Sequence, residues 1–142
     1  MKVNIDTSGF KAAMAEKKAK IQGATRAMTQ AGAEVIYNGA RINVPVSDHP
    51  HMFHGTNAIY GPYAPGSLRD AIYQVYSTDN SSASKATYHV AWNHKKAPYG
   101  FMVEFGTSKT APHSFLGKAR VELSAAASDA MEMEFERRMA AP

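Results

Sequence analysis

Apolar and small residues recur at helical spacing through the first third of the chain. Five large apolar residues stand seven positions apart, and alanines fill the rows between them, which is typical of one stripe of a helix. Gly32 falls on the opposite side with several lysines and threonines. The pattern predicts a helix over residues 10–43 whose stripe is buried in the core, although a helix of this length can also serve a partner subunit. The stripe consists of Met14, Ile21, Met28, Val35 and Ile42.

Alternating apolar and polar residues mark the segments expected to be extended. Val3 and Ile5 predict a short edge strand over residues 1–6. Residues 68–76 and 86–92 alternate in the same way, and the polar segment between them predicts an antiparallel hairpin with a long exposed tip. Residues 99–105 are expected to form a third strand, with one helical turn as the alternative. These segments together predict a three-stranded antiparallel meander.

A second helical stripe begins after Pro112 and continues toward the C-terminus, where Arg137 and Arg138 complement the helix dipole. The predicted order is therefore a long N-terminal helix, a three-stranded meander and a long C-terminal helix. This is an α+β fold in a single domain spanning residues 1–142. The second stripe consists of Phe115, Leu116, Ala119, Leu123, Ala126, Ala127, Ala130 and Met133.

Residues 47–66 interrupt this order with prolines, glycines and no sustained periodicity, which predicts a long loop. The loop contains His49, His51 and His54, and three imidazoles are enough donors to consider a zinc or nickel site. Their spacing matches no helical pair, and Asp48 is the only nearby carboxylate. A solvated loop is therefore the favoured interpretation, with the three histidines as weak metal-site candidates.

Composition narrows the possible functions. A hydrophobic fraction of 44% and a charged fraction of 20% predict a folded domain, and the absence of cysteine excludes disulfides and thiolate metal sites. The first residues contain no apolar core of a signal peptide and no later run is long enough to span a bilayer, so the sequence predicts synthesis in the cytoplasm and neither export nor membrane insertion. The net charge of +4 permits nucleic-acid contact, for which Lys95 and Lys96 beside Trp92 and Tyr99 are candidates.

No catalytic set is evident. Glu104, between Val103 and Phe105, could act as a desolvated general base, but no histidine, serine or cysteine stands beside it in the sequence. An ion pair or a helix-cap role for Glu104 is favoured. The segment 106–110 has a glycine, a lysine and threonines but lacks the spacing of a phosphate-binding loop. The sequence predicts no enzyme activity and no cofactor.

Two regions together resemble a known protein family. Residues 97–109 contain a tyrosine followed by Val-Glu-Phe-Gly-Thr at 103–107, and a Pro-His-Ser-Phe-Leu helix entry follows at 112–116. Upstream, Pro-Val at 45–46 ends the long helix and Gly-Ser-Leu-Arg-Asp-Ala-Ile follows at 66–72. This order resembles the tail-completion or head-tail connector proteins of long-tailed double-stranded DNA phages, the gene-product-ten-like family. The family passes from Pro-Val to Gly-x-Leu through a short link, so residues 47–66 are an insertion here.

The resemblance implies a non-enzymatic virion protein of the phage neck or tail, made in the host cytoplasm. It implies a ring of about six copies that completes the tail and meets tail-terminator, tail-tube and head-tail connector proteins, with DNA passing through the lumen. A tail terminator or minor tail subunit is the nearest alternative. A small nucleic-acid-binding module and a small hydrolase are the alternatives from other classes.

Within this interpretation, individual residues have expected roles. Glu104 is expected to pair with a basic group inside the subunit or across an interface. Phe105 and Phe115 are expected to anchor the turn that Gly106 permits. Thr107 and Lys109 belong to the exposed loop that follows. Subunit contacts are expected from the loops at 106–111, 78–85 and 47–66.

Overall fold

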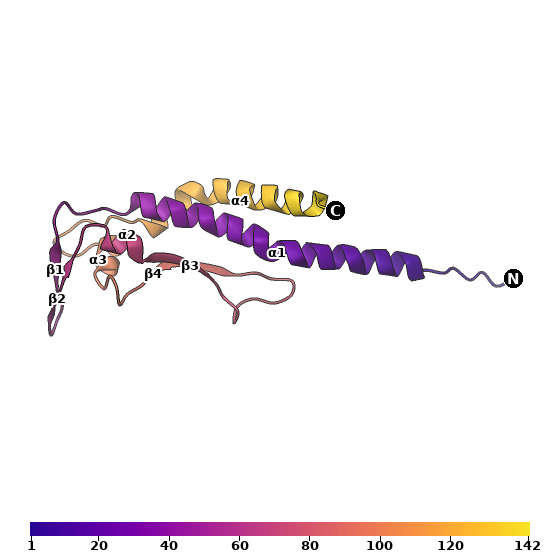
Figure 1. Ribbon diagram of the computed structural model, residues 1–142, viewed down its shortest axis with the longest axis horizontal. Helices are drawn as coiled ribbons and strands as arrows, with labels where there is room; N and C mark the ends of the chain where they lie inside the picture. The colour runs from indigo at the N-terminus through magenta and orange to yellow at the C-terminus, as the bar shows by residue number, and fades with distance from the viewer.

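The computed structural model describes residues 1–142 and has an elongated shape built along one helix. Helix α1 (Ser8–Asn43) forms the long axis, and α4 (Leu116–Ala140) packs along one side of its C-terminal half. Strands β3 (Ile72–Tyr76) and β4 (Tyr88–Trp92) lie on the other side of α1 (Figure 1). The mixed helix and sheet class and the two long helices are therefore confirmed.

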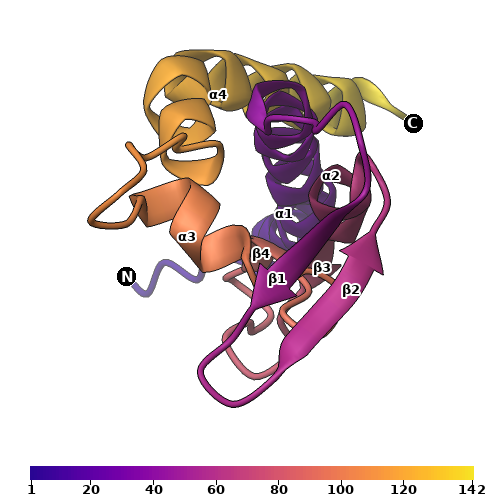
Figure 2. The same ribbon diagram turned by 90° about the vertical axis from the view of Figure 1, so that its left-hand side faces the viewer.

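The remaining elements gather where α1 ends. They are β1 (His51–His54), β2 (Ile59–Tyr63), the short helix α2 (Ser67–Ala71) and helix α3 (Gly100–Phe105). Viewed from this end, the β1–β2 hairpin lies in front of α1, and α3 leads into the start of α4 (Figure 2). The N-terminus lies at the far end of the molecule, beyond the part of α1 that α4 covers (Figure 1).

Small residues of α1 make room for larger side chains of α4 where the two helices meet. The buried positions of α1 are Ala24, Gly32, Gly39 and Ala40. A Cβ at Gly39 would overlap Leu123, and a Cβ at Gly32 would lie 2.7 Å from the Met131 side chain. The assignment of Gly32 to the outer side was therefore wrong, because two helices that approach this closely need positions without side chains.

The predicted large apolar stripe of α1 is only partly buried. Met28 and Val35 are half-buried, whereas Met14 and Ile42 are 52% and 82% exposed and Ile21 is also exposed. Similarly, Met133 on α4 is exposed, while Ala119 and Ala127 are buried. Helical spacing located both helices correctly, but the side chains that fill their contact are smaller than the stripe implied.

Replacing Gly39 with valine should test this close packing. The added side chain has no space beside Leu123, and overpacking of this kind typically lowers the free energy of unfolding by about 1–3 kcal/mol. Gly23→Val is the matched control, because a Cβ at Gly23 meets nothing within 4 Å. Urea unfolding of the two variants provides the comparison. Equal stabilities for Gly39→Val and Gly23→Val would contradict the packing described here.

The antiparallel hairpin of β3 and β4 was correctly predicted, and Ile72 pairs with Trp92 and Tyr76 with Tyr88. Its inner face meets α1, where the Arg26 guanidinium lies 4.0 Å from the centre of the Tyr76 ring. Its outer face leaves Tyr73 and Val75 exposed. The predicted strand at 68–76 begins too early, however, because Gly66 adopts φ 84° and starts α2, which buries Leu68.

Three other expectations were wrong. The structure has two separate two-stranded sheets, β1–β2 and β3–β4, and not a three-stranded meander, because residues 100–105 are helical. The segment 47–66 is not a loop throughout, since it contains the β1–β2 hairpin, closed by a hydrogen bond from the Gly55 N–H to the Ala58 carbonyl. Residues 1–6 form no strand, because no other strand lies beside them to supply hydrogen bonds.

The main core lies where the end of α1, the start of the β3–β4 hairpin and the start of α4 meet. Phe115 is fully buried there, and its ring stands edge-on to Trp92 with centroids 5.6 Å apart. Gly100 packs directly against the Trp92 indole, where a larger residue has no room. This core fixes α3 against the start of α4. The core cluster comprises Ala40, Val44, Leu68, Ala71, Ile72, Trp92, Ala97, Phe115 and Ala119.

None of the helices combines the length and apolar character that crossing a bilayer requires.

Candidate functional site

The segment that carries the family-like motif forms a turn between α3 and α4, which we call the α3–α4 corner (residues 100–117). Helix α3 ends at Phe105, the chain turns at Gly106, an exposed loop follows, and α4 begins at Leu116. The His113 N–H donates to the Val103 carbonyl over 2.8 Å, which ties the end of the loop back to α3. The motif therefore coincides with one compact structural unit.

Glu104 holds the two helices of the corner together. Its carboxylate accepts hydrogen bonds from the Ser114 hydroxyl (2.8 Å) and from the backbone N–H groups of Phe115 (2.8 Å), Leu116 (3.0 Å) and Gly117 (2.9 Å). The free N–H groups at a helix start favour a negative charge, so this carboxylate caps α4 from outside that helix. The helix-cap interpretation of Glu104 matches these contacts, and no cation pairs with Glu104 inside the subunit.

The environment of Glu104 favours its charged form. Burial of the carboxyl raises its pKa, but the hydrogen bonds from Gly117, Leu116, Ser114 and Phe115 lower it by more. The pKa of Glu104 consequently lies below its ordinary value. A carboxylate held in this state by four donors is suited to structural support, and a general base would need an open oxygen to accept a proton.

Gly106 and Thr107 shape the loop after α3. Gly106 has φ 75° and ψ 177°, a conformation that other residues rarely adopt, and a Cβ there would lie 2.7 Å from the Pro112 nitrogen. The Thr107 Oγ1 accepts from the N–H groups of Lys109 (3.2 Å) and Thr110 (3.1 Å). The loop is thus ordered by its own hydrogen bonds while its tip at Lys109 stays exposed.

The two phenylalanines expected to anchor the turn behave differently. Phe115 is fully buried against Trp92, and the Asn43 amide donates to its carbonyl over 3.5 Å. Phe105 is 62% exposed and packs on Phe101, with ring centroids 4.7 Å apart. Phe115 is therefore the internal anchor, whereas Phe105 does not fix the turn from within and remains available for contact with another molecule.

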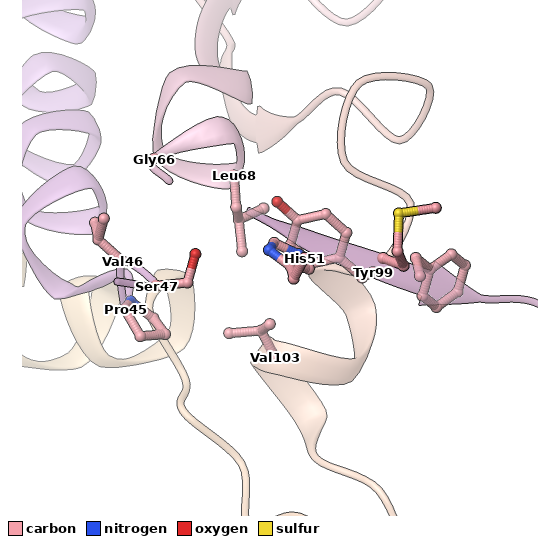
Figure 3. A pocket seen from close by; sticks show the side chains of 10 residues that line it. Pro45, Val46, Ser47, His51, Gly66, Leu68, Tyr99 and Val103 are labelled. Carbon is pink, nitrogen blue, oxygen red and sulfur yellow. The ribbon is translucent and has the colours of Figure 1, made fainter. Parts of the chain in front are cut away.

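A cleft of about 370 Å³ lies beside the corner, between the end of α1 and the β1–β2 hairpin. Ser47 faces it from one side and His51 and Tyr99 from the other, and Leu68 and Val103 point into it (Figure 3). The His51 and Tyr99 rings meet edge-on with centroids 4.6 Å apart, and Tyr63 joins them 5.1 Å from Tyr99. These aromatic contacts attach the hairpin to α3.

The histidines of the insertion do not come together. His51 packs among Tyr63 and Tyr99, while His54 lies at the other end of β1 in a different cleft that also contains His94. No group of three or more histidine, cysteine, aspartate or glutamate side chains is close enough to hold a metal ion. The packing of His51 gives this residue a structural role in the hairpin, which spacing alone did not indicate.

The two aromatic residues considered for nucleic-acid stacking differ in burial. Trp92 is buried against Phe115 and Gly100, whereas Tyr99 is half-buried, contacts the β1–β2 hairpin and lines the cleft beside the corner. Lys95 and Lys96 are exposed. In this conformation the buried Trp92 ring cannot take part in base stacking, whereas stacking on Tyr99 stays a prediction.

Large apolar side chains are exposed at this end of the molecule, on β1, β2 and α3. Phe101 and Phe105 form one pair on α3, and the hairpin presents others beside the cleft. We call these residues the end surface. Apolar groups that remain exposed together in this way are typical of a contact with another protein. The end surface consists of Met52, Ile59, Tyr60, Phe101, Met102 and Phe105.

Several residues that build the corner were missed in the sequence. Ser114 and Gly117 hold the Glu104 carboxylate, and a Cβ at Gly117 would lie 2.7 Å from the Ser114 hydroxyl oxygen and 3.1 Å from the carboxylate. No local signal could have indicated Ser114, because its hydroxyl donates to Glu104 of a preceding element and caps no backbone N–H of α4. Searches of protein-family models, curated proteins and solved structures found no significant match to this chain.

Proposed function

We propose that this protein is a structural subunit of a phage neck or tail, which forms a ring that completes the tail and joins it to the head connector. The family resemblance of the α3–α4 corner motivates the proposal. The corner supports it because its motif residues serve structural ends: Glu104 caps α4, Gly106 permits the turn and Phe115 fills the core. Such a role needs no catalytic centre. The subunit would be made in the host cytoplasm and incorporated into the virion.

The observation that carries the proposal is the large exposed surface of the single chain. A folded monomer of 15.4 kDa exposes about 7,200 Å² by the usual scaling with mass. This chain exposes 10050 Å². Only 16 of its 142 residues are buried, and many large apolar side chains lie on the surface. The excess is about 2,900 Å², and it supports the proposal because surface that a lone subunit exposes can be buried between copies.

The shape of the chain also fits a ring. A cyclic assembly needs a heterologous interface, in which one face of a subunit meets a different face of the next. The end surface lies at one end of the long axis, and the uncovered part of α1 lies at the other end (Figure 1). The loops at 106–111 and 78–85 and the hairpin within 47–66 project from the body and are further candidate contacts.

Light scattering on the purified chain, alone and with tail-tube, tail-terminator and connector proteins, tests the proposal. We expect a closed oligomer with a mass several times 15.4 kDa, alone or on mixing, because burying the exposed apolar surface between subunits is favourable. A strict monomer under both conditions would contradict the proposal.

A DNA mobility assay at moderate salt addresses the nucleic-acid alternative. A monomer that shifts DNA with a steep salt dependence would favour a nucleic-acid-binding module. If rings form, negative-stain images of particles labelled on this subunit would separate a tail-completion role from that of a tail terminator or minor tail subunit, because the three differ in their position.

A further inference from the structure

The N-terminal part of α1 extends beyond the end of α4 and carries an apolar stripe that α4 does not cover. Met14 and Ile21 of this stripe line an open cleft that Ser84, in the tip of the β3–β4 hairpin, borders on one side. The Lys20 ammonium donates to the Ala141 carbonyl over 2.6 Å, so α4 ends beside Lys20. Residues 8–19 of α1 lie past this point (Figure 1). Phe10 and Met14 are 67% and 52% exposed there, and Ile21 is exposed next to them. We call residues 8–21 of α1 the arm.

The apolar stripe of the arm continues the face of α1 that contacts α4. Met14 and Ile21 precede Met28 at steps of seven, which keeps them on nearly the same side of the helix. Met28 lines a small cleft with Met131 and Phe135 of α4. The side of α1 that binds α4 is therefore longer than α4 itself, and its unused part has the character of a helix-binding surface.

The positive net charge of the chain also lies in its N-terminal part, which includes the arm. Residues 1–26 hold six lysines and arginines against two acids, which accounts for the whole net charge of +4 and leaves residues 27–142 neutral overall. Lys17 and Lys18 flank the apolar stripe and are exposed, and neither forms a salt bridge within the subunit. A partner for the arm should therefore combine apolar and acidic groups on one surface.

The outer side of α4 has this combination. Residues 121–136 contain five carboxylates and no lysine or arginine. Glu134 is engaged by Arg137 at 2.7 Å and Arg138 at 2.9 Å, but the other four carboxylates form no salt bridge. Val121 and Met133 lie among them and are largely exposed. The four free carboxylates are Glu122, Asp129, Glu132 and Glu136.

We infer that the arm of one copy binds the outer side of α4 in the neighbouring copy, with the stripe of Phe10, Met14 and Ile21 against Val121 and Met133 and with Lys17 and Lys18 facing the free carboxylates. This inference rests on the proposed ring, for which it supplies a heterologous contact. The end surface is a poorer partner for the arm, because a positive group, Lys95, borders it in the cleft that Tyr60 and Met102 line. Opposite charges across the contact would select the partner face and repel the wrong one.

A charge exchange tests the contact in the full chain, under the conditions in which the wild type associates. Lys17→Glu/Lys18→Glu and, separately, Asp129→Lys/Glu132→Lys should each weaken self-association about tenfold or more, because each places like charges across the interface. An equal mixture of the two variants should recover association, since each arm then meets an α4 of opposite charge. Glu34→Lys, a charge reversal at an exposed residue of α1 outside both the arm and the end surface, should associate like the wild type.

Circular dichroism checks that all variants keep the wild-type helix content, as expected for exposed positions. If the wild type associates and each charge variant by itself associates equally well, the arm contact is wrong, whereas the ring proposal is unaffected. A wild type that stays monomeric alone and with tail proteins would overturn both. The Lys17→Glu/Lys18→Glu variant should also be assayed for binding to DNA and to anionic vesicles. If this variant forms wild-type oligomers but loses one of these binding activities, the arm binds that partner and the arm contact is rejected.

Discussion

Replacing Gly106 with valine is expected to lower the free energy of unfolding by about 3 kcal/mol or more, which would leave much of the protein unfolded or insoluble. Gly106 combines φ 75° with ψ 177°, a region that is nearly restricted to glycine. The added side chain would also collide with the backbone of the loop, since a Cβ would lie 2.7 Å from the Pro112 nitrogen and 2.9 Å from the Thr110 carbonyl oxygen. Backbone atoms on both sides leave no easy relief.

The fraction of soluble protein and its urea midpoint measure this effect. Gly23→Val is again the control, because its Cβ meets no atom within 4 Å and its backbone is helical. The α3–α4 corner sets the start of α4, so a disturbed turn should also prevent assembly. A Gly106→Val protein that folds as stably as Gly23→Val, and forms the same oligomers as the wild type, would refute the role assigned to Gly106.

Replacing Glu104 with glutamine is expected to have the second largest effect, a loss of about 2–4 kcal/mol in the free energy of unfolding. The carboxylate accepts from four donors, three of which are backbone N–H groups at the start of α4. Glutamine has nearly the same size but only one acceptor oxygen, and its NH₂ group would face N–H groups. Buried donors would lose their partners, while the packing would hardly change.

The pH dependence of stability identifies the charge of Glu104 as the cause. Because the pKa of Glu104 is lowered in the folded state, its stabilisation is fully present above the ordinary value of 4.5 and is lost as the pH falls through the lowered folded-state pKa. Wild-type stability should therefore decline below about pH 4.5, and the Glu104→Gln variant should decline less steeply.

Urea unfolding at several pH values between 3 and 7 measures both effects. Glu34→Gln is the control, because Glu34 is exposed and forms no salt bridge or side-chain hydrogen bond. Equal stability of Glu104→Gln and Glu34→Gln at neutral pH, with the same slope in acid, would show that Glu104 does not cap α4.

The predictable part of the candidate site was its local chemistry. Glu104 stands between apolar residues and shortly before a proline-led helix start, and this pattern favoured a cap or an ion pair over catalysis. The choice between the two roles required the structure, since it depends on whether N–H groups or a cation reach the carboxylate. The exposure of Phe105 was also unpredictable, because Phe105 and Phe115 have the same side chain and differ only in what packs beside them.

Local sequence patterns were sufficient to predict the two long helices, the end of α1 before Pro45, the β3–β4 hairpin and the mixed class of the fold. These features depend on spacing, proline and turn residues, which act over a few neighbouring positions. Tertiary structure decided the helical state of α3, the hairpin within 47–66 and the burial of Gly32 and Gly39. Each of these depends on contacts between segments far apart in the chain, where a short apolar run fits a strand or a helix equally well until a neighbour such as Trp92 selects one.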